Sequence, residues 1–341
     1  MSANGYPALL RRVLGGGHMD AGEMAATIGA IMDETLSSVR AGALLAALAA
    51  KGETVEEIVG AARAMRERSL HVDCDLATID VCGTGGDGAG TINVSTAVAF
   101  VLAGGGLRVA KHGNRAASSR CGSADVLEAV GITVEISPEQ AAQQLRAHGI
   151  TFLFAQLYHP AMRAVAPVRR ELGVRTIFNV LGPLTNPARA ARQVIGVPQE
   201  RWVGLLGEAL RALGAEAGAV VHAESGLDEV AGDSPSKIFQ FGAAGARSWT
   251  LVPHDYGIRA TLEDLRGGDA TENAEALVRI LGGERSPRAD VVCLNAALAF
   301  VVAGRAGSID EGLVLARSSI DEGKARGALD ALRGRPQMEF A

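Results

Sequence analysis

The sequence predicts an α/β protein in which a small N-terminal helical domain precedes a larger domain, a mostly parallel sheet covered by helices. The first 70 residues show helical periodicity without strand patterns. From about residue 79 onward, short apolar runs alternate with helical patterns, which is typical of a parallel sheet. The composition of 48% hydrophobic residues, only 4% aromatics and 43 glycines suits helices packed on a sheet. We place the domains at residues 1–72 and 73–341.

The N-terminal helices are predicted from their start and stop signals. Asp20 and Glu23 have the spacing of a capping box, and apolar residues follow at helical intervals. A second helix should end at Gly52, and Thr54 with Glu57 forms another capping box for a third. These short amphipathic helices must bury their apolar faces against another part of the chain.

The rest of the chain is predicted to alternate strands and helices. Strands are expected at residues 79–82, 107–110, 132–136, 150–154, 194–197 and 217–221. Helices are expected at residues 123–130, 138–149, 201–213, 289–302 and 308–326. The order of these segments favours parallel strand pairs with helical crossovers.

Charge and cysteine content argue against several classes of protein. The chain has 33 Lys and Arg against 38 Asp and Glu, and a net charge of −5 does not suit a nucleic-acid binder. Its 4 cysteines form no CxxC pair, so neither a zinc site nor a disulfide framework is indicated. No signal-peptide pattern occurs, and the apolar runs are shorter than the about 18 residues of a membrane helix. We expect a cytoplasmic protein without nucleic-acid or membrane partners.

A glycine-rich loop at residues 83–88 (GTGGDG) follows the first predicted strand. Such a loop lets backbone N–H groups approach a phosphate closely, although a plain glycine turn is the alternative. Its spacing also fits GxGxxG, but Lys111 and His112 stand where a dinucleotide site expects an acidic residue. An NADP-type enzyme is therefore the weaker interpretation. A Walker A loop is excluded, because Ala89 and Gly90 occupy its Lys and Ser/Thr positions.

Two further segments carry donors suited to anions. Asn93, Ser95 and Thr96 stand at a predicted helix N-terminus, where the helix dipole favours phosphate, although ordinary capping would use the same residues. The loop at 111–119 (KHGNRAASS) follows the next predicted strand and gathers cations, an amide and hydroxyls. Open α/β sheets bind ligands at this end of their strands, so we interpret this loop as a polyphosphate cradle.

Long motifs in this sequence resemble the anthranilate phosphoribosyltransferase family. The motifs are DVCGTGGDGAGTINVST, VAKHGNRAASSRCGSADVLEAVG, HPAMRAVAPVRRELGVRTIFNVLGPLTNP and GLDEV, and the resemblance covers essentially the whole chain. It implies transfer of a phosphoribosyl group from phosphoribosyl diphosphate (PRPP) to anthranilate in tryptophan biosynthesis. It also implies the nucleoside phosphorylase/phosphoribosyltransferase type of fold, a segment near 167–190 that joins the helical domain, and a homodimer through the helical part.

The resemblance further implies the residues that bind the substrates. Those matching PRPP positions are Gly83, Gly86, Asp87, Thr91, Asn93, Val94, Ser95, Thr96, Lys111, His112, Gly113, Asn114, Arg115, Ala116, Ala117, Ser118, Ser119 and Ser123. Those matching magnesium positions are Ser95, Asp228 and Glu229. Those matching anthranilate contacts are Gly83, Asn114 and Arg169, with His112 and His159 nearby.

The chemistry of this reaction agrees with these residue types. Mg²⁺ prefers a few carboxylates together with substrate oxygens, which Asp228 and Glu229 can provide. An aromatic amine is already neutral at pH 7, so we assign no catalytic base and give His112 an orienting role. Arg169 can clamp a carboxylate through its two-pronged guanidinium. A pyrimidine nucleoside phosphorylase and a non-catalytic nucleic-acid-binding relative are the alternatives within this architecture.

Overall fold

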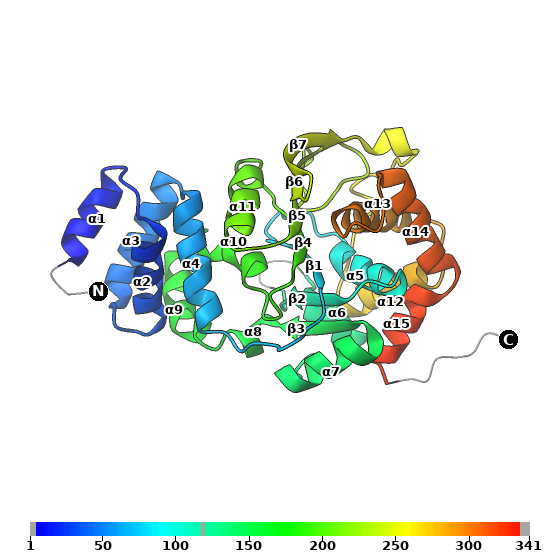
Figure 1. The fold of residues 1–341 in the computed structure, drawn as a ribbon, viewed down its shortest axis with the longest axis horizontal. Helices are drawn as coiled ribbons and strands as arrows, with labels where there is room; N and C mark the ends of the chain where they lie inside the picture. Colours follow the sequence, from blue (N-terminus) through cyan, green and yellow to red (C-terminus); the bar gives the residue numbers. More distant parts are fainter. Residues whose placement is uncertain (1–4, 117–119, 335–341) are drawn as a thin grey trace.

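The structure, a computed structural model, describes residues 5–116 and 120–334. Its N-terminal part is helical and lies at one end of the molecule (Figure 1). The helices there are α1 (Tyr6–Leu14), α2 (Ala21–Met32), α3 (Ser38–Lys51) and α4 (Val55–Glu67). The segment that follows β3 returns to this part, where α9 packs on α2 and α3.

The predicted capping boxes form at α2 and α4. Asp20 Oδ1 accepts from Glu23 N at 2.8 Å, and Thr54 Oγ1 accepts from Glu57 N at 3.3 Å. Glu57 is buried and also accepts from Met19 N at 3.0 Å, which ties α4 to the start of α2. Each cap satisfies N–H groups that the first helical turn leaves without partners.

Within the described residues, seven strands form one sheet in the order β3-β2-β1-β4-β5-β6-β7. The strands are β1 (Ile79–Gly83), β2 (Val109–Gly113), β3 (Ile150–Phe154), β4 (Arg192–Gly196), β5 (Ala217–Ala223), β6 (Ser236–Gly242) and β7 (Gly245–Leu251). The pairs from β3 to β5 are parallel, and β6 and β7 are antiparallel. The mostly parallel sheet predicted from the sequence is confirmed.

Helices cover both faces of the sheet (Figure 1). They and the short 3₁₀ turns are α5 (Val94–Gly104), α6 (Ser123–Ala129), α7 (Pro138–His148), α8 (Ala155–Tyr158), α9 (Met162–Leu172), α10 (Phe178–Leu181), η1 (Gly182–Thr185), α11 (Arg201–Ala212), η2 (Pro253–Tyr256), α12 (Ala270–Leu281), α13 (Pro287–Val302), α14 (Ile309–Asp321) and α15 (Lys324–Leu332). Val194 and Ile195 are adjacent in β4 and belong to two different hydrophobic clusters. The second cluster continues into the helical part, so one core joins the two.

The structure corrects several predicted elements. Residues 132–136 alternate between buried and exposed positions like a half-buried strand, but they form no strand, because none of the described strands pairs with them. The single helix predicted at 308–326 is interrupted at Gly323, which separates α14 from α15. The β6–β7 hairpin was not predicted, because its turn residues, Ala243 and Ala244, lack the Asn-Gly pattern that signals hairpins. The strand predicted at 107–110 runs instead from Val109 to Gly113.

No helix among the described residues is long and apolar enough to cross a membrane.

Candidate active site

Three loops meet at the carboxyl edge of the parallel strands. The glycine-rich loop follows β1, the KHGN segment ends β2 and leads into the loop after it, and Asp228 lies beyond β5. Gly85 N donates to Asp228 Oδ2 at 2.7 Å, which joins the first and third loops directly. Thr84 N donates to Gly196 O at 2.9 Å, which ties the glycine-rich loop to the end of β4. Ligands bind at this edge in open α/β sheets.

Two glycines allow Asp228 to sit against the strand ends. A Cβ on Gly83 would lie 2.1 Å from Asp228 Oδ2, and a Cβ on Gly196 would lie 1.5 Å from Asp228 O. Any other residue at either position would displace the acidic loop. These two glycines are therefore required for close packing of the loop.

The acidic residues form a crowded, weakly solvated group. Burial and the charge of Asp87 raise the pKa of Asp228, and burial and the charge of Asp228 raise the pKa of Glu229. The Lys111 ammonium acts in the opposite direction on Glu229. Mutual repulsion of this kind would be relieved by a divalent cation. Among the described residues no group of three or more His, Cys, Asp or Glu could hold a metal alone, so ligand oxygens would have to complete the shell.

Lys111 lies between the glycine-rich loop and the start of α5. Its side chain is buried, and Nζ donates to Val81 O at 2.8 Å and to Ser95 Oγ at 3.3 Å. An ammonium has three N–H donors, so one is left after these two bonds. Lys111 therefore places a positive charge beside Ser95 and Glu229.

His112 and His159 form a buried pair. Their Nε2 atoms are 3.2 Å apart, and His112 Nδ1 is 3.1 Å from Gly182 O. Since the Gly182 carbonyl can only accept, His112 carries its proton on Nδ1, and the neutral ring accepts at Nε2 from His159. Burial lowers the pKa of His112 well below its usual range and the pKa of His159 to about 4. Both rings are thus neutral at pH 7.

The remaining loop residues mostly hold the cradle in shape. Asn93 Nδ2 donates to Cys121 O at 3.2 Å, while Asn93 Oδ1 accepts from Asn273. Arg115 donates to Glu128 at 2.7 Å and also pairs with Asp125.

Other predicted residues lie at the edges of elements or inside α5. Thr91 forms an isolated antiparallel β-bridge with Arg266. Val94 and Thr96 are buried in α5, and Ser123 is the first residue of α6. Asn114 Oδ1 accepts a hydrogen bond from Gln156 Nε2. The predicted contacts Ala117, Ser118 and Ser119 lie outside the described residues.

The predicted acceptor clamp, Arg169, is half-buried in the last turn of α9. Burial lowers its pKa, and within the described ranges its side chain has neither a hydrogen bond nor an ion pair. Arg170, beside it, is exposed. The structure thus leaves the Arg169 guanidinium available to an anion, although no contact in the structure joins it to His112 or Asn114.

Comparisons with known proteins assign the family. Residues 75–326 match the glycosyl transferase family a/b domain, and residues 7–69 match the helical bundle domain of that name. Anthranilate phosphoribosyltransferase from Phenylobacterium zucineum is 48% identical over 331 residues, covering 97% of this chain and 98% of that protein. The chain belongs to the anthranilate phosphoribosyltransferase family.

Solved structures agree with this assignment. The anthranilate phosphoribosyltransferase of Thermus thermophilus has a TM-score of 0.89 at 46% identity, covering 95% of this chain and 98% of that chain. A Saccharomyces cerevisiae anthranilate phosphoribosyltransferase in complex with PRPP and Mg has a TM-score of 0.89 at 26% identity, covering 98% of both chains. The fold class expected from the resemblance is confirmed. Such full-length similarity favours the transferase over the dinucleotide-binding and nucleoside phosphorylase alternatives.

Sequence reasoning missed two residues that build the site in this anthranilate phosphoribosyltransferase family member. Asp80, buried in β1, accepts from His112 N at 3.1 Å and from Asn186 Nδ2 at 2.7 Å. Asn186 also donates to Ala110 O at 2.8 Å, so the pair fixes the end of β2, which carries Lys111 and His112. One signal was available: Asp80 is the only charged residue in an otherwise apolar predicted strand.

Arg175 is a third residue that the sequence did not point to. Its two terminal nitrogens donate to Gly85 O at 3.2 and 3.3 Å, which holds the glycine-rich loop from the segment after α9. Arg175 is exposed, and 90 residues separate it from Gly85. No local pattern predicts a contact over that separation.

Proposed function

We propose that the chain transfers the phosphoribosyl group of PRPP to the amine of anthranilate, giving N-(5-phosphoribosyl)anthranilate and diphosphate in tryptophan biosynthesis. The observation that supports this most directly is the bond between Gly85 and Asp228. It brings a phosphate-binding type of loop against the acidic pair, and the neutral histidine pair suits an acceptor whose attacking amine is uncharged. Membership of the anthranilate phosphoribosyltransferase family supports the same reaction.

On the donor side, the leaving diphosphate must be stabilised as the bond between ribose and diphosphate oxygen breaks. Mg²⁺ supplies that stabilisation when bound, as a Lewis acid on phosphate oxygens. Asp228, Glu229 and Ser95 would hold it together with substrate oxygens, in keeping with the crowded carboxylates. Backbone N–H groups of the glycine-rich loop and the Lys111 charge are placed to bind the phosphates.

On the acceptor side, the amine nitrogen of anthranilate attacks the anomeric carbon and afterwards loses one proton to water or phosphate oxygen. A protonated histidine pair would repel the positive charge that develops on the ribose. Because His112 and His159 are neutral, they do not repel it. His112 is fixed through Gly182 and Asp80, which suits an orienting role and not that of a base. Arg169 binds the anthranilate carboxylate, and catalysis rests on positioning and on stabilising the leaving group.

The domain division, assembly and location belong to the same proposal. The helical domain comprises residues 1–72 with the segment near 167–190, which includes the end of α9 where it packs on α2 and α3. Exposed Leu14 on α1 and Val39 on α3 support a homodimer through this helical part. A biosynthetic role that uses soluble substrates suits the cytoplasm.

A product assay tests the proposed function. Incubating the chain with anthranilate, PRPP and Mg²⁺ should consume anthranilate and yield a product heavier by one phosphoribosyl group in mass spectrometry. A parallel incubation with a pyrimidine nucleoside and phosphate should yield no free base. Phosphorolysis of the nucleoside with anthranilate left intact would overturn the proposal.

A further inference from the structure

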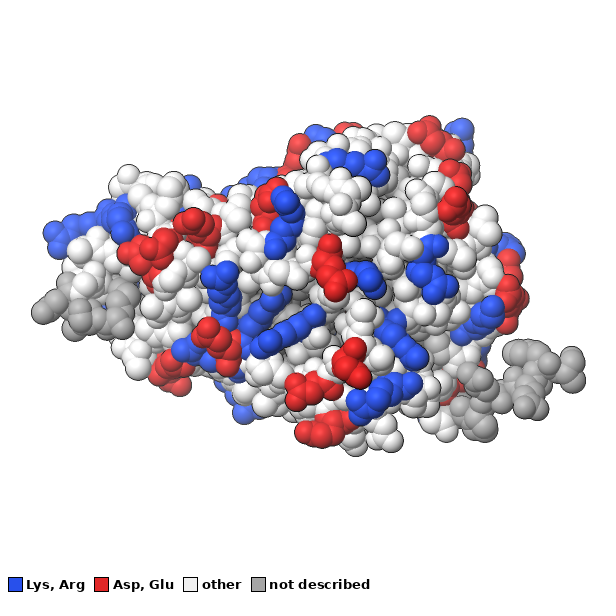
Figure 2. All heavy atoms as spheres, viewed as in Figure 1, with Lys and Arg blue, Asp and Glu red and all other residues white. Residues whose placement is uncertain are grey.

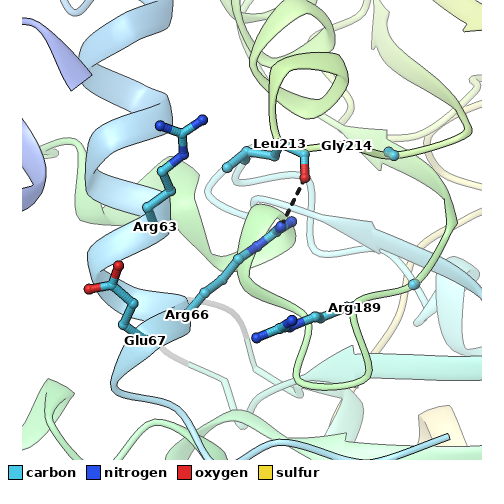
Figure 3. A pocket seen from close by; sticks show the side chains of 8 residues that line it. Arg63, Arg66, Glu67, Arg189, Leu213 and Gly214 are labelled. Carbon is cyan, nitrogen blue, oxygen red and sulfur yellow. Dashed lines mark hydrogen bonds between the residues drawn. The ribbon is translucent and has the colours of Figure 1, made fainter. Parts of the chain in front are cut away.

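A polar cavity of about 350 Å³ lies between α4, the turn that follows Asn186 and the end of α11 (Figure 3). It shares no lining residue with the candidate active site. Its charged lining residues are Arg63, Arg66, Glu67 and Arg189. Three cations against one carboxylate give the cavity a net positive charge.

Arg66 is held at one wall of this cavity. Its Nε donates to Leu184 O at 2.7 Å and its NH1 donates to Leu213 O at 3.3 Å, as the dashed line in Figure 3 shows for Leu213. Within the described residues no carboxylate pairs with it. Burial, with the charges of Arg189 and Arg63, lowers its pKa to about 10, so the group stays charged at pH 7.

Arg63 and Arg189 are exposed, and among the described residues neither side chain has a hydrogen bond or ion pair. Arg189 has a φ of 48°, a left-handed conformation that arginine rarely adopts. Its N–H donates to Asn186 O at 2.9 Å, which fixes the turn that presents the side chain to the cavity. In Figure 3 the Arg66 and Arg189 side chains extend toward each other from opposite walls.

The one acidic lining residue does not neutralise this group. Figure 3 shows the Glu67 carboxylate on the other side of α4 from the Arg66 and Arg189 guanidinium groups. The nearest cation to it is Arg68, at 3.8 Å. The wider surface agrees, because Lys and Arg side chains gather where the helical part meets the α/β part on the face in Figure 2.

We propose that this pocket, formed by Arg63, Arg66 and Arg189, binds a phosphate-type oxyanion. Guanidinium groups match tetrahedral oxyanions through paired N–H donors. Arg66 and Arg189 reach into the pocket from opposite walls, Arg63 adds a third positive charge from α4, and among the described residues no carboxylate pairs with any of them. The volume is at the lower end of the range for small-molecule sites, and the charged lining suits a compact hydrophilic anion. Free phosphate and the diphosphate group carry the same chemistry. This site does not depend on the proposed function.

An anion in this pocket would connect α4 to the turn that Asn186 begins. Arg63 and Arg66 come from α4, whereas Arg189 lies in the turn that Asn186 begins. Asn186 in turn donates to Asp80, so the turn is continuous with the network that holds His112. Binding to the folded chain should therefore raise its thermal stability.

Titration calorimetry with inorganic phosphate tests the proposal, using the full chain without Mg²⁺ at constant ionic strength. The test variant is Arg63→Gln/Arg189→Gln, which keeps Arg66 and its carbonyl contacts. The matched control, Arg146→Gln/Arg305→Gln, removes two exposed arginines elsewhere. Phosphate binding at the glycine-rich loop is common to all three proteins and cancels in the comparison.

We expect the test variant to lose one binding event, or at least about tenfold in affinity, while the control keeps the wild-type isotherm. Arg63→Lys/Arg189→Lys should be intermediate, because an ammonium keeps the charge without the two-pronged geometry. A second titration with diphosphate distinguishes the two sources: tighter binding than phosphate at the same site would point to diphosphate, and equal binding to free phosphate. Identical isotherms for the wild type and the folded test variant would overturn the proposal.

Discussion

The backbone N–H of Gly85 donates a 2.7 Å hydrogen bond to Oδ2 of Asp228, across 143 residues of sequence. This contact joins the phosphate-binding type of loop after β1 to the acidic loop beyond β5. Because Gly83 and Gly196 also leave no room for a side chain beside Asp228, the two loops have one fixed relative position. The donor site of the proposed reaction is therefore built into the strand ends of the folded chain.

Lys111 is predicted to act on the donor. Lys111→Met keeps the apolar stem but removes the charge beside Ser95 and Glu229. We expect a rise in the KM for PRPP or a fall in kcat that far exceeds any change in the KM for anthranilate. Steady-state kinetics with each substrate varied in turn measures this. Equal effects on both substrates, in a protein with normal thermal stability, would instead indicate general damage to the loop.

Arg169 is predicted to clamp the anthranilate carboxylate. Arg169→Ala removes a charge-assisted contact of roughly 1.5–3 kcal/mol, which corresponds to a loss of about 10- to 150-fold in kcat/KM for anthranilate. Arg170 points about 100° away on α9 and is exposed, so Arg170→Ala should stay near wild type. Arg169→Lys should recover only part of the loss. Kinetics in which both alanine variants behave alike, or in which the Arg169 defect falls mainly on PRPP, would rule out the clamp.

The acidic pair predicts an unusual pH dependence of stability in the absence of Mg²⁺ and substrate. Burial and the charge of Asp87 raise the pKa of Asp228 to about 7, and burial and the charge of Asp228 raise the pKa of Glu229 to about 8. Both lie above the unfolded-state values of about 4. The native state thus binds more protons than the unfolded state between about pH 4 and pH 8. Stability from these groups is complete below that window and is lost as the pH rises through it.

Thermal unfolding between pH 5 and pH 8.5 measures this effect. Each titrating proton contributes up to about 1.4 kcal/mol per pH unit, or about 2 °C in Tm for a chain of this length. Asp228→Asn/Glu229→Gln should have a flatter profile than the wild type over this range. Parallel profiles for the two proteins would show that the acidic pair does not titrate as the structure indicates.

Asp80 is predicted to be a positioning residue whose loss destabilises the fold. Asp80→Ala leaves His112 N and Asn186 Nδ2 without their acceptor, at a cost of about 1–3 kcal/mol for each buried group. We expect a clear fall in Tm together with a loss of activity. Asp80→Asn should keep part of both, because its carbonyl oxygen can still accept one bond. Asp73→Ala, at an exposed acidic position, is the control, and an equal Tm for both alanine variants would contradict this role.

The sequence was most informative where the structural signal is local. Capping boxes at Asp20 and Thr54 predicted the starts of α2 and α4, and glycine-rich turns after apolar runs located two of the loops that meet at the site. Contacts between distant segments left no such signal. Arg175 reaches Gly85 across 90 residues and Asn186 reaches Asp80 across 106, and nothing in the local pattern of either residue indicates its partner.

Strand prediction failed where pairing decides the outcome. Residues 132–136 have strand-like alternation, but none of the strands in the described part of the chain pairs with them. The β6–β7 hairpin forms around Ala243 and Ala244, residues without turn preference, and it is held by pairing along the full length of both strands, with Gly245 after the turn at a φ of 94°. Periodicity reports which side of a segment is buried, whereas sheet membership depends on a partner elsewhere in the chain.

The measurement that tests the central claim most directly is anthranilate fluorescence followed with PRPP over a titration of Mg²⁺, in the wild type and in Asp228→Asn/Glu229→Gln. The account predicts that the wild type consumes anthranilate in a Mg²⁺-dependent manner. It predicts that the folded variant loses at least about 100-fold in rate, a loss of about 2.7 kcal/mol of transition-state stabilisation, and that additional Mg²⁺ does not restore it. A variant that consumes anthranilate at the wild-type rate at limiting Mg²⁺, or a folded wild type that leaves anthranilate unchanged, would contradict the account.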